Sequence, residues 1–476
     1  EPSLGAVPWP WRTSSREWEE ADMAFRAWSF PRDFTGPSVA EVALPSPGGE
    51  EEVLQTPDLS RAQLGKLLDF LREEAVPALS CLPVDRIVEA VDRVARKFRD
   101  PMSPLRLEAL SAIRVQAGYS LPMATRVLDG MARDWTRRRL EALLEAEFPD
   151  PRVLDGFRPG SGGGWVRARG YPVVFHLGAG SVPGVTATSM IRALLVKSGS
   201  LVRPGRGDVA LSVLLARGLT EADPEMGRAL AVAYWPDPQG HLTRTALEGA
   251  DLAVVYGGDD TLGWVRGVLP PTTPLRGYRH RVGVGVVGRE ALKGEGPASR
   301  VARQAAEAVG LFDQRGCVSP HLFLVEEGGS ISPEGWARLL AQALEALEET
   351  LPSGPLSPED GARLQQWRGQ AEVQESVGRG FVLHGNAAAP WTVHFAPGGE
   401  LTASCLNRGV RVVPVEGLDG VPPFLEPWRR HLQTVGVAGL GDGRKGFLEA
   451  LAALGVSRVT SLDQVRRVER VIVAML

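Results

Sequence analysis

The chain has 476 residues, a formal net charge of −4 and 43% hydrophobic residues, which is ordinary for a soluble globular protein of two or three domains. This charge gives no reason to expect nucleic acid as a partner. No apolar run approaches the roughly eighteen residues that span a bilayer, and residues 1–30 lack the apolar core of a signal peptide. We therefore expect a cytoplasmic protein without a transmembrane segment.

The three cysteines, Cys81, Cys317 and Cys405, lie far apart in the sequence. They form no CxxC pair and no Cys/His spacing of the kind that binds zinc, so neither a disulfide framework nor a metal site is predicted. Their small number fits a reducing compartment.

Composition and periodicity divide the chain into five segments. Residues 1–58 are rich in Pro and Gly and predict an irregular N-terminal arm, whereas residues 59–157 have helical spacing. The Gly-rich residues 158–164 mark a boundary, after which the helical spacing gives way to alternating strand and helix patterns. We expect residues 158–289 to form a dinucleotide-binding domain. A catalytic domain is expected over residues 290–440, with residues 441–476 completing it.

The helical segment predicts four helices after a Ser60 cap, the last of them over residues 123–147. The run Arg137-Arg138-Arg139 on that helix is typical of a solvated face. These helices could pack beside the sheet, mediate assembly or dock a partner.

From residue 171 onward, strand and helix patterns alternate. The predicted strands are 171–177, 200–203, 229–235, 252–256 and 281–287, and the predicted helices between them are 185–196, 209–219 and 261–268. This alternation predicts a parallel sheet with helices on both faces and ligands beyond the carboxyl ends of its strands. The later elements are a helix at 297–310, a strand at 322–325, a helix at 333–351, a polar Gln-rich linker, and further strands and helices at 411–415, 432–437, 445–454 and 458–460.

Two glycine-rich turns follow predicted strands. The first contains Gly178 and Gly180, and the second contains Gly257, Gly258 and Gly263. Neither has the GxGxxG spacing of an ordinary dinucleotide fingerprint, and Gly-rich turns of this kind are common in α/β folds. The helix that follows the second turn could hold a pyrophosphate with its N-terminal amides.

Cys317 lies between Gly316 and Ser319-Pro320, in a turn where a thiol can be reached. Free cysteines are often inert packing residues, but a thiolate near backbone amides has a lowered pKa and is nucleophilic. His321 is the nearest histidine in the sequence. A nucleotide-binding sheet followed by a loop cysteine suggests covalent catalysis joined to hydride transfer.

Three motifs together, 178–184, 255–261 and 312–320, carry a resemblance to a known family. Over about residues 60–460 the chain resembles the acyl-CoA reductases typified by the fatty acyl reductase of bacterial bioluminescence operons, a branch of the aldehyde dehydrogenase superfamily. The resemblance implies an aldehyde dehydrogenase-like α/β fold. It consists of a Rossmann-type parallel-sheet cofactor domain and a second α/β catalytic domain, with a helical N-terminal region.

The same resemblance implies roles for individual residues. Cys317 matches the nucleophile that takes up the acyl group, and Ser181 stands where an oxyanion-hole asparagine is expected. Arg203 occupies the position of a lysine that contacts the adenosine ribose. With Arg206 nearby, Arg203 would suit a 2′-phosphate and therefore NADPH, although both arginines could simply be a solvated loop pair.

Further implied roles concern the glycines and the reaction. Gly258 and Gly263 match glycines near the pyrophosphate. The strand at 281–287 lacks the glutamate with which hydrolytic aldehyde dehydrogenases activate water, so a thioester on Cys317 should wait for hydride. His321 either takes part in acid–base work or orients the loop.

We therefore expect NADPH-dependent reduction of a long-chain acyl-CoA to the aldehyde through an acyl-cysteine. Alternatives are an NAD(P)-dependent aldehyde dehydrogenase, an acyl-phosphate reductase on the same fold, and a non-catalytic acyl-binding subunit. The expected partners are acyl-CoA or an acylated protein, and a second copy of the chain in a dimer or tetramer.

Overall fold

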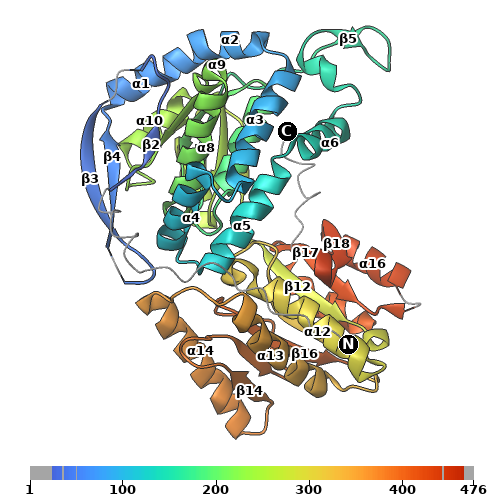
Figure 1. Ribbon diagram of the computed structural model, residues 1–476. Helices are drawn as coiled ribbons and strands as arrows, with labels where there is room; N and C mark the ends of the chain where they lie inside the picture. Colours follow the sequence, from blue (N-terminus) through green and yellow to red (C-terminus); the bar gives the residue numbers. More distant parts are fainter. Residues whose placement is uncertain (1–23, 35–36, 50, 442–443, 466–476) are drawn as a thin grey trace, which may run out of the picture.

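The computed structural model describes residues 24–34, 37–49, 51–441 and 444–465. The chain forms two halves, each built around a central sheet; in Figure 1 the blue-to-green segments make up the upper half and the yellow-to-red segments the lower half. No helix in the described part of the chain is long and apolar enough to cross a membrane.

The sheet of the first half has six strands in the order β11-β10-β7-β8-β9-β2. Its pairs are parallel except for β2 against β9 at the edge. The strands are β2 (Trp28–Ser29), β7 (Val173–Leu177), β8 (Gly199–Arg203), β9 (Leu230–Ala233), β10 (Leu252–Tyr256) and β11 (Leu275–Tyr278). Almost every residue of β7 to β10 is buried, as their runs of Val, Leu and Ala require.

Helices cover this sheet, and α3 and α4 pack on α8 while α1 packs on α10. A capping box at Ser60 and Gln63 starts the first helix. The helices are α1 (Arg61–Phe70), α2 (Val76–Cys81), α3 (Val84–Arg99), α4 (Pro104–Ala117), α5 (Leu121–Asp134), α6 (Arg137–Glu147), α7 (Val185–Leu195), α8 (Val209–Ala222), α9 (Pro224–Gly227), α10 (His241–Gly249) and α11 (Asp259–Val268).

The second sheet has seven strands in the order β14-β15-β16-β13-β12-β17-β18. The pairs are parallel except β14 with β15. The strands are β12 (Val282–Val287), β13 (Pro320–Glu326), β14 (Phe381–His384), β15 (Thr392–Phe395), β16 (Gly409–Val415), β17 (Leu432–Ala438) and β18 (Arg458–Ser461).

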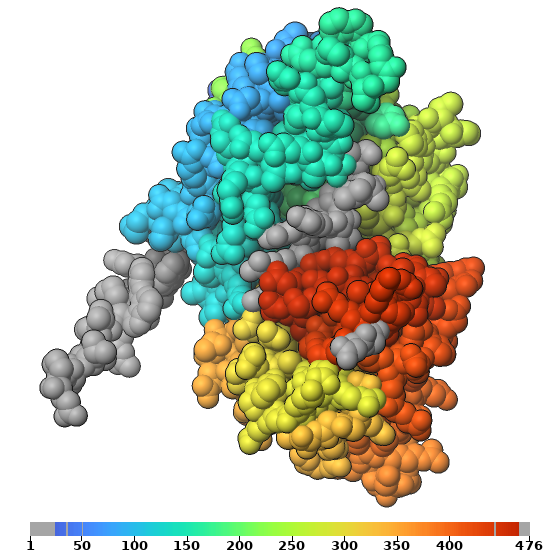
Figure 2. Space-filling view, turned by 90° about the vertical axis from the view of Figure 1, so that its right-hand side faces the viewer, coloured from blue at the N-terminus to red at the C-terminus, as the bar shows by residue number. Residues whose placement is uncertain are grey.

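Two apolar clusters fill the faces of the second sheet. One is formed with α12 (Glu295–Gly310) and α13 (Pro333–Thr350), and the other with α15 (Val421–Leu425) and α16 (Arg444–Ala453). Figure 2 shows this second half as a yellow-to-red block below the blue-to-green residues of the first. The nucleophile candidate therefore belongs to the lower block and the glycine-rich turns to the upper one.

Three sequence predictions are corrected. The strand predicted at 281–287 exists as β12, but it lies in the second sheet; the fifth parallel strand of the first sheet is β11. The helix predicted over 123–147 is two helices, α5 and α6, which meet at Trp135-Thr136. The supposed polar linker after α13 is α14 (Pro358–Ser376), which Ser357 caps and whose buried residues are Leu364, Trp367, Arg368 and Ala371.

The segment predicted as an irregular arm contains strands. Besides β2, these are β1 (Phe25–Arg26), β3 (Ser38–Pro45) and β4 (Glu51–Asp58), which form a sheet in the order β1-β4-β3. Residues 1–23 lie outside the described residues, as do 442–443 and 466–476 of the last predicted segment. A short hairpin of β5 (Arg158–Pro159) and β6 (Trp165–Val166) projects from the upper end of the first half (Figure 1).

Candidate active site

Cys317 follows a turn with unusual backbone geometry. Three consecutive residues, Phe312, Asp313 and Gln314, have φ of 59°, 47° and 64°, and none of them is glycine. Each left-handed residue of this kind costs roughly 1–2 kcal/mol. The surrounding contacts must offset that cost, so the loop is held in place by specific partners.

A buried ion pair supplies the main support. Arg408, whose side chain is wholly buried, donates from Nε and Nη2 to Asp313 Oδ1 at 3.1 and 2.9 Å and from Nη1 to Glu348 Oε1 at 2.5 Å. Arg408 itself ends a second left-handed run, residues 406–408. The pair thus joins two strained turns to each other and to α13.

Gln314 ties the same loop to the sheet. Its side-chain amide donates to the carbonyls of Pro320 and Gly409, both at 2.7 Å. These residues begin β13 and β16, so the nucleophile loop sits at the N-terminal ends of the two neighbouring strands.

The Cys317 side chain reaches solvent although protein surrounds it closely. That surrounding protein raises the pKa of the thiol by desolvation, and its own backbone N–H and the positive charge of Arg281 offset the rise in part. Arg281 immediately precedes β12, where Gly283 packs against the backbone of Ser319. The residue before this strand thus contributes a positive charge that acts on the thiol, while its Nη1 donates to the carbonyl of Arg430 at 2.9 Å.

The glycines of the first turn are explained by backbone packing. A Cβ on Gly180 would lie 2.6 Å from Gly207 N, and one on Gly205 would lie 2.2 Å from Gly180 N. A Cβ on Gly178 would lie 2.3 Å from Thr186 Oγ1. The turns after β7 and β8 are thus in direct main-chain contact at the carboxyl edge of the sheet.

A buried carboxylate occupies the N-terminus of α7. Asp208 accepts hydrogen bonds from the amides of Gly184 (2.6 Å) and Thr186 (3.0 Å), and burial raises the pKa of this carboxyl to about 7. These amides are therefore not available to a phosphate.

At α11, by contrast, no side chain of the described residues caps the helix N-terminus. There a Cβ added to Gly258 would meet only the ring of His280, at 3.4 Å, and one added to Gly263 would meet nothing within 4 Å. The two aspartates of the first turn oppose an anion, but Arg279 pairs with Asp259 at 3.4 Å. Of the two glycine-rich turns, the one before α11 is therefore the one whose helix amides are left open, and its role in holding a pyrophosphate stays a prediction.

Arg203 and Arg206, the two arginines that the sequence suggests for binding a 2′-phosphate, differ in burial. Arg203 is buried, donates to the carbonyl of Trp235 at 2.9 and 3.2 Å and to that of Pro236 at 3.3 Å, and stacks on Tyr234. Arg206 is exposed, and its positive charge acts on the carboxyl group of Glu52. Arg203 therefore holds the chain at the end of β9, and only Arg206 of the two is open to solvent; its contact with a cofactor stays a prediction.

Ser181 and the nucleophile loop come together through a third residue. The Tyr119 hydroxyl oxygen lies 3.2 Å from the Ser181 carbonyl and 3.5 Å from the Phe312 carbonyl. One hydroxyl thus reaches both the first glycine turn and the loop that carries Cys317.

His321 is placed on β13 with its Nδ1 3.0 Å from Ser404 Oγ. Burial lowers its pKa to about 4, so the ring is neutral near pH 7. In the described part of the chain it has no hydrogen bond to Cys317. Its acid–base role stays a prediction.

Sequence reasoning missed Arg281, Tyr119 and Arg408 as parts of this site. Only Arg281 had a signal, because it stands at the start of the strand already singled out for lacking a carboxylate. Tyr119 and Arg408 are found only when distant segments are brought together.

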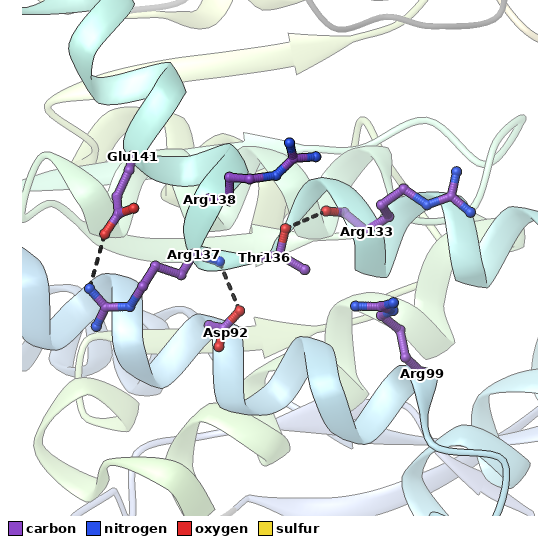
Figure 3. A pocket seen from close by; sticks show the side chains of 7 residues that line it. All are labelled: Asp92, Arg99, Arg133, Thr136, Arg137, Arg138 and Glu141. Carbon is purple, nitrogen blue, oxygen red and sulfur yellow. Dashed lines mark hydrogen bonds and ion pairs between the residues drawn. The ribbon is translucent and has the colours of Figure 1, made fainter.

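A separate hollow of about 550 Å³ lies among α3, α5 and α6 (Figure 3). Arg137, from the run interpreted as a solvated face, donates its backbone N–H to Asp92 at 2.8 Å and pairs with Glu141 and Glu89 at 3.0 and 2.6 Å. Its contacts with Asp92 and Glu89 therefore hold the start of α6 against α3. Arg138 alongside is exposed, as predicted for that face.

Taken with the two sheets, the Cys317 loop and the glycine turns define an oxidoreductase of the aldehyde dehydrogenase fold. The NAD-dependent aldehyde dehydrogenase from Sinorhizobium meliloti matches with a TM-score of 0.71 at 14% identity, covering 94% of this chain and 89% of that one. The NADP-dependent glyceraldehyde-3-phosphate dehydrogenase from Bacillus halodurans, complexed with NADP, matches with a TM-score of 0.67 at 13% identity, covering 92% and 90%.

The chain belongs to the acyl-CoA reductase (LuxC) family, whose model matches residues 79–470. A long-chain acyl-protein thioester reductase of Aliivibrio fischeri is 23% identical over 383 residues, which is 79% of this chain and 76% of the relative. The expected family and fold are thereby confirmed.

Proposed function

We propose that this protein reduces a long-chain acyl thioester to the aldehyde through an acyl group carried on Cys317. The observation that carries the proposal is a solvent-reachable cysteine, held on a braced loop, in a chain of the acyl-CoA reductase family. The relative named above is a long-chain acyl-protein thioester reductase, which supports the choice of a long acyl chain.

The reaction begins at the sulfur. The Cys317 thiolate attacks the thioester carbonyl, and the negative oxygen that forms is stabilised by the Cys317 N–H and by Ser181. The C–S bond to the donor then breaks, the donor thiolate takes a proton, and acyl-Cys317 remains. When bound, a reduced nicotinamide supplies the hydride that brings the acyl group to the aldehyde level. Collapse of the resulting thiohemiacetal breaks the bond to Cys317, regenerates its thiolate and releases the aldehyde.

The charge of Arg281, which acts on the thiol, favours reduction over hydrolysis. Arg281 carries a positive charge that stabilises the thiolate and cannot accept a proton from water. The strand that follows Arg281 has no carboxylate to activate water, so a thioester on Cys317 should persist until hydride arrives. This supports an acyl reductase above an aldehyde dehydrogenase that forms free acid.

NADPH is the proposed hydride donor. Arg206, exposed beside the turn after β8, supplies the cation for a 2′-phosphate, in place of the Arg203–Arg206 pair suggested by the sequence. The donor of the acyl group is proposed to be acyl-CoA or an acylated protein.

Intact-protein mass spectrometry tests this proposal. The chain is mixed with a long-chain acyl-CoA, and NADPH is added afterwards, with Cys317→Ala as the control. An adduct that maps to Cys317 and disappears with NADPH as aldehyde forms supports the reductase. An adduct on Cys317→Ala, or none with either acyl-CoA or an acylated protein, overturns it. Oxidation of aldehyde to free acid without CoA would favour the dehydrogenase.

A homo-oligomer is also proposed, with the β5–β6 hairpin as contact. Phe157, Trp165 and Val166 are 60%, 70% and 47% exposed there, and a lone pair of two-residue strands gains little stability by itself. Light scattering of Trp165→Ser should give a lower mass than the wild type. An unchanged mass would refute the contact.

A further inference from the structure

The connection between α4 and α5 touches both halves of the molecule. Gly118 ends α4 in a left-handed conformation, and its carbonyl lies so near Gly354 that a Cβ there would be 1.8 Å away. Ser120 Oγ donates to the Pro352 carbonyl at 2.5 Å. A loop of the first half is therefore seated on the second half, close to the residues that brace Cys317.

Tyr119 stands at the centre of this connection and is only 2% exposed. Its hydroxyl is 3.2 Å from the Ser181 carbonyl and 3.5 Å from that of Phe312, and since it has one proton the shorter distance favours donation to Ser181. The tyrosine thus fixes the first glycine turn from one side.

Arg315 fixes the nucleophile loop from the other side. Its guanidinium carbon lies 4.7 Å from the centre of the Tyr119 ring, and its Nη1 donates to the Ala117 carbonyl at 2.7 Å. Arg315 is two residues before Cys317 in the sequence. Arg315 therefore links the tyrosine directly to the segment that carries Cys317.

From these contacts we infer that Tyr119 and Arg315 are positioning residues that set the distance between the Ser181 turn and Cys317. Neither residue is proposed to touch the acyl group or the cofactor. Their effect is to hold the cofactor-side turn against the nucleophile, so that a nicotinamide and an acyl group can meet. This inference rests on the proposed function only for the assignment of that turn to the cofactor side.

The reaction with iodoacetamide offers a test that does not depend on turnover. Alkylation of Cys317 is followed by peptide mass spectrometry with and without NADP⁺ or NAD⁺, in the wild type, Tyr119→Phe and Arg315→Lys. Tyr171→Phe and Arg338→Lys are the controls, because Tyr171 is an exposed tyrosine and Arg338 stacks on Phe381 at 4.3 Å on the surface.

A bound nicotinamide should shield Cys317 in the wild type and in both controls. In Tyr119→Phe and Arg315→Lys we expect the rate without cofactor to stay within about twofold, while the shielding factor falls about fivefold, the value of one buried hydrogen bond. A purely structural role would instead change both rates together.

Three results would overturn the inference. These are unchanged shielding in both variants, an equal change with and without cofactor, and no shielding in the wild type at saturating cofactor. Failure of the proposed function appears separately, as a wild type that is shielded by cofactor yet takes up no acyl group.

Discussion

Replacement of Arg408 by methionine is expected to destabilise the nucleophile loop strongly. The Arg408 side chain is fully buried, and it joins Asp313 and Glu348, whose side chains are 4% and 10% exposed. Removing one member of a buried ion pair typically costs about 3–5 kcal/mol, because the other charges stay buried without their partner.

The remaining contacts place the cost at the lower end of this range. Asp313 keeps the amide of Gly354 at 3.2 Å, and Glu348 keeps the amide and the hydroxyl of Ser353 at 2.9 and 3.2 Å. Each carboxylate therefore retains hydrogen bonds after the substitution. We expect Arg408→Met to lower the free energy of opening the loop by about 3 kcal/mol, which raises the population of the open loop roughly 150-fold.

Hydrogen exchange followed by mass spectrometry measures this opening in peptides that cover 311–320 and 404–411. Arg363→Met is the matched control, because Arg363 pairs with Glu359 on the surface, where such pairs contribute about 0–1 kcal/mol. If Arg408→Met accelerates exchange in these peptides no more than the control does, the buried pair does not stabilise the loop and the reasoning fails.

Further predictions concern the thiol, the buried carboxyl and the glycines. Arg281→Gln should raise the pKa of Cys317 further and move the pH profile of its alkylation upward, whereas no shift or a downward shift would contradict the role of Arg281. Asp208, with a pKa of about 7 against an ordinary 3.8, binds a proton in the folded state that the unfolded chain releases. The wild type should therefore lose stability relative to Asp208→Asn as pH rises from about 4 to 7. If the melting temperatures of the two proteins change equally with pH across that window, the raised pKa of Asp208 is contradicted. Gly205→Ala should lower the melting temperature, because its Cβ would lie 2.2 Å from backbone, while Gly263→Ala, in open helix, should gain up to about 1 kcal/mol. Equal melting temperatures of these two variants would refute the packing explanation.

In the first half, the strands that could be predicted are those whose sequences are continuous apolar runs, because such strands are buried on both faces of the sheet. The strand predicted at 252–256 is β10, residue for residue. Its neighbour β11 reads Leu-Arg-Gly-Tyr and lies at the edge of the sheet, so it has no apolar run to reveal it. The strand at 282–287 was visible, but a strand's own sequence does not state which sheet it joins.

The site divides in the same way. Cys317 was predictable because the residues that form its turn are its neighbours in the sequence. Arg281 stands directly before a recognisable strand. Tyr119 and Arg408 were not, since the contacts that give them a role join residues 62 and 95 positions apart. Nor could the sequence tell Arg203 from Arg206, because only burial separates an arginine that holds a backbone from one that faces solvent.

The strand β2 has a practical consequence for any shortened form of this protein. It covers the outer edge of β9, and Trp28 within it is 7% exposed, although the family match begins only at residue 79. A chain cut to the matched region would uncover the main-chain groups of β9 and the apolar surface beneath the tryptophan. Exposed sheet edges recruit other strands, so such a fragment should aggregate. The working unit of this enzyme therefore starts well before the part by which its family is recognised.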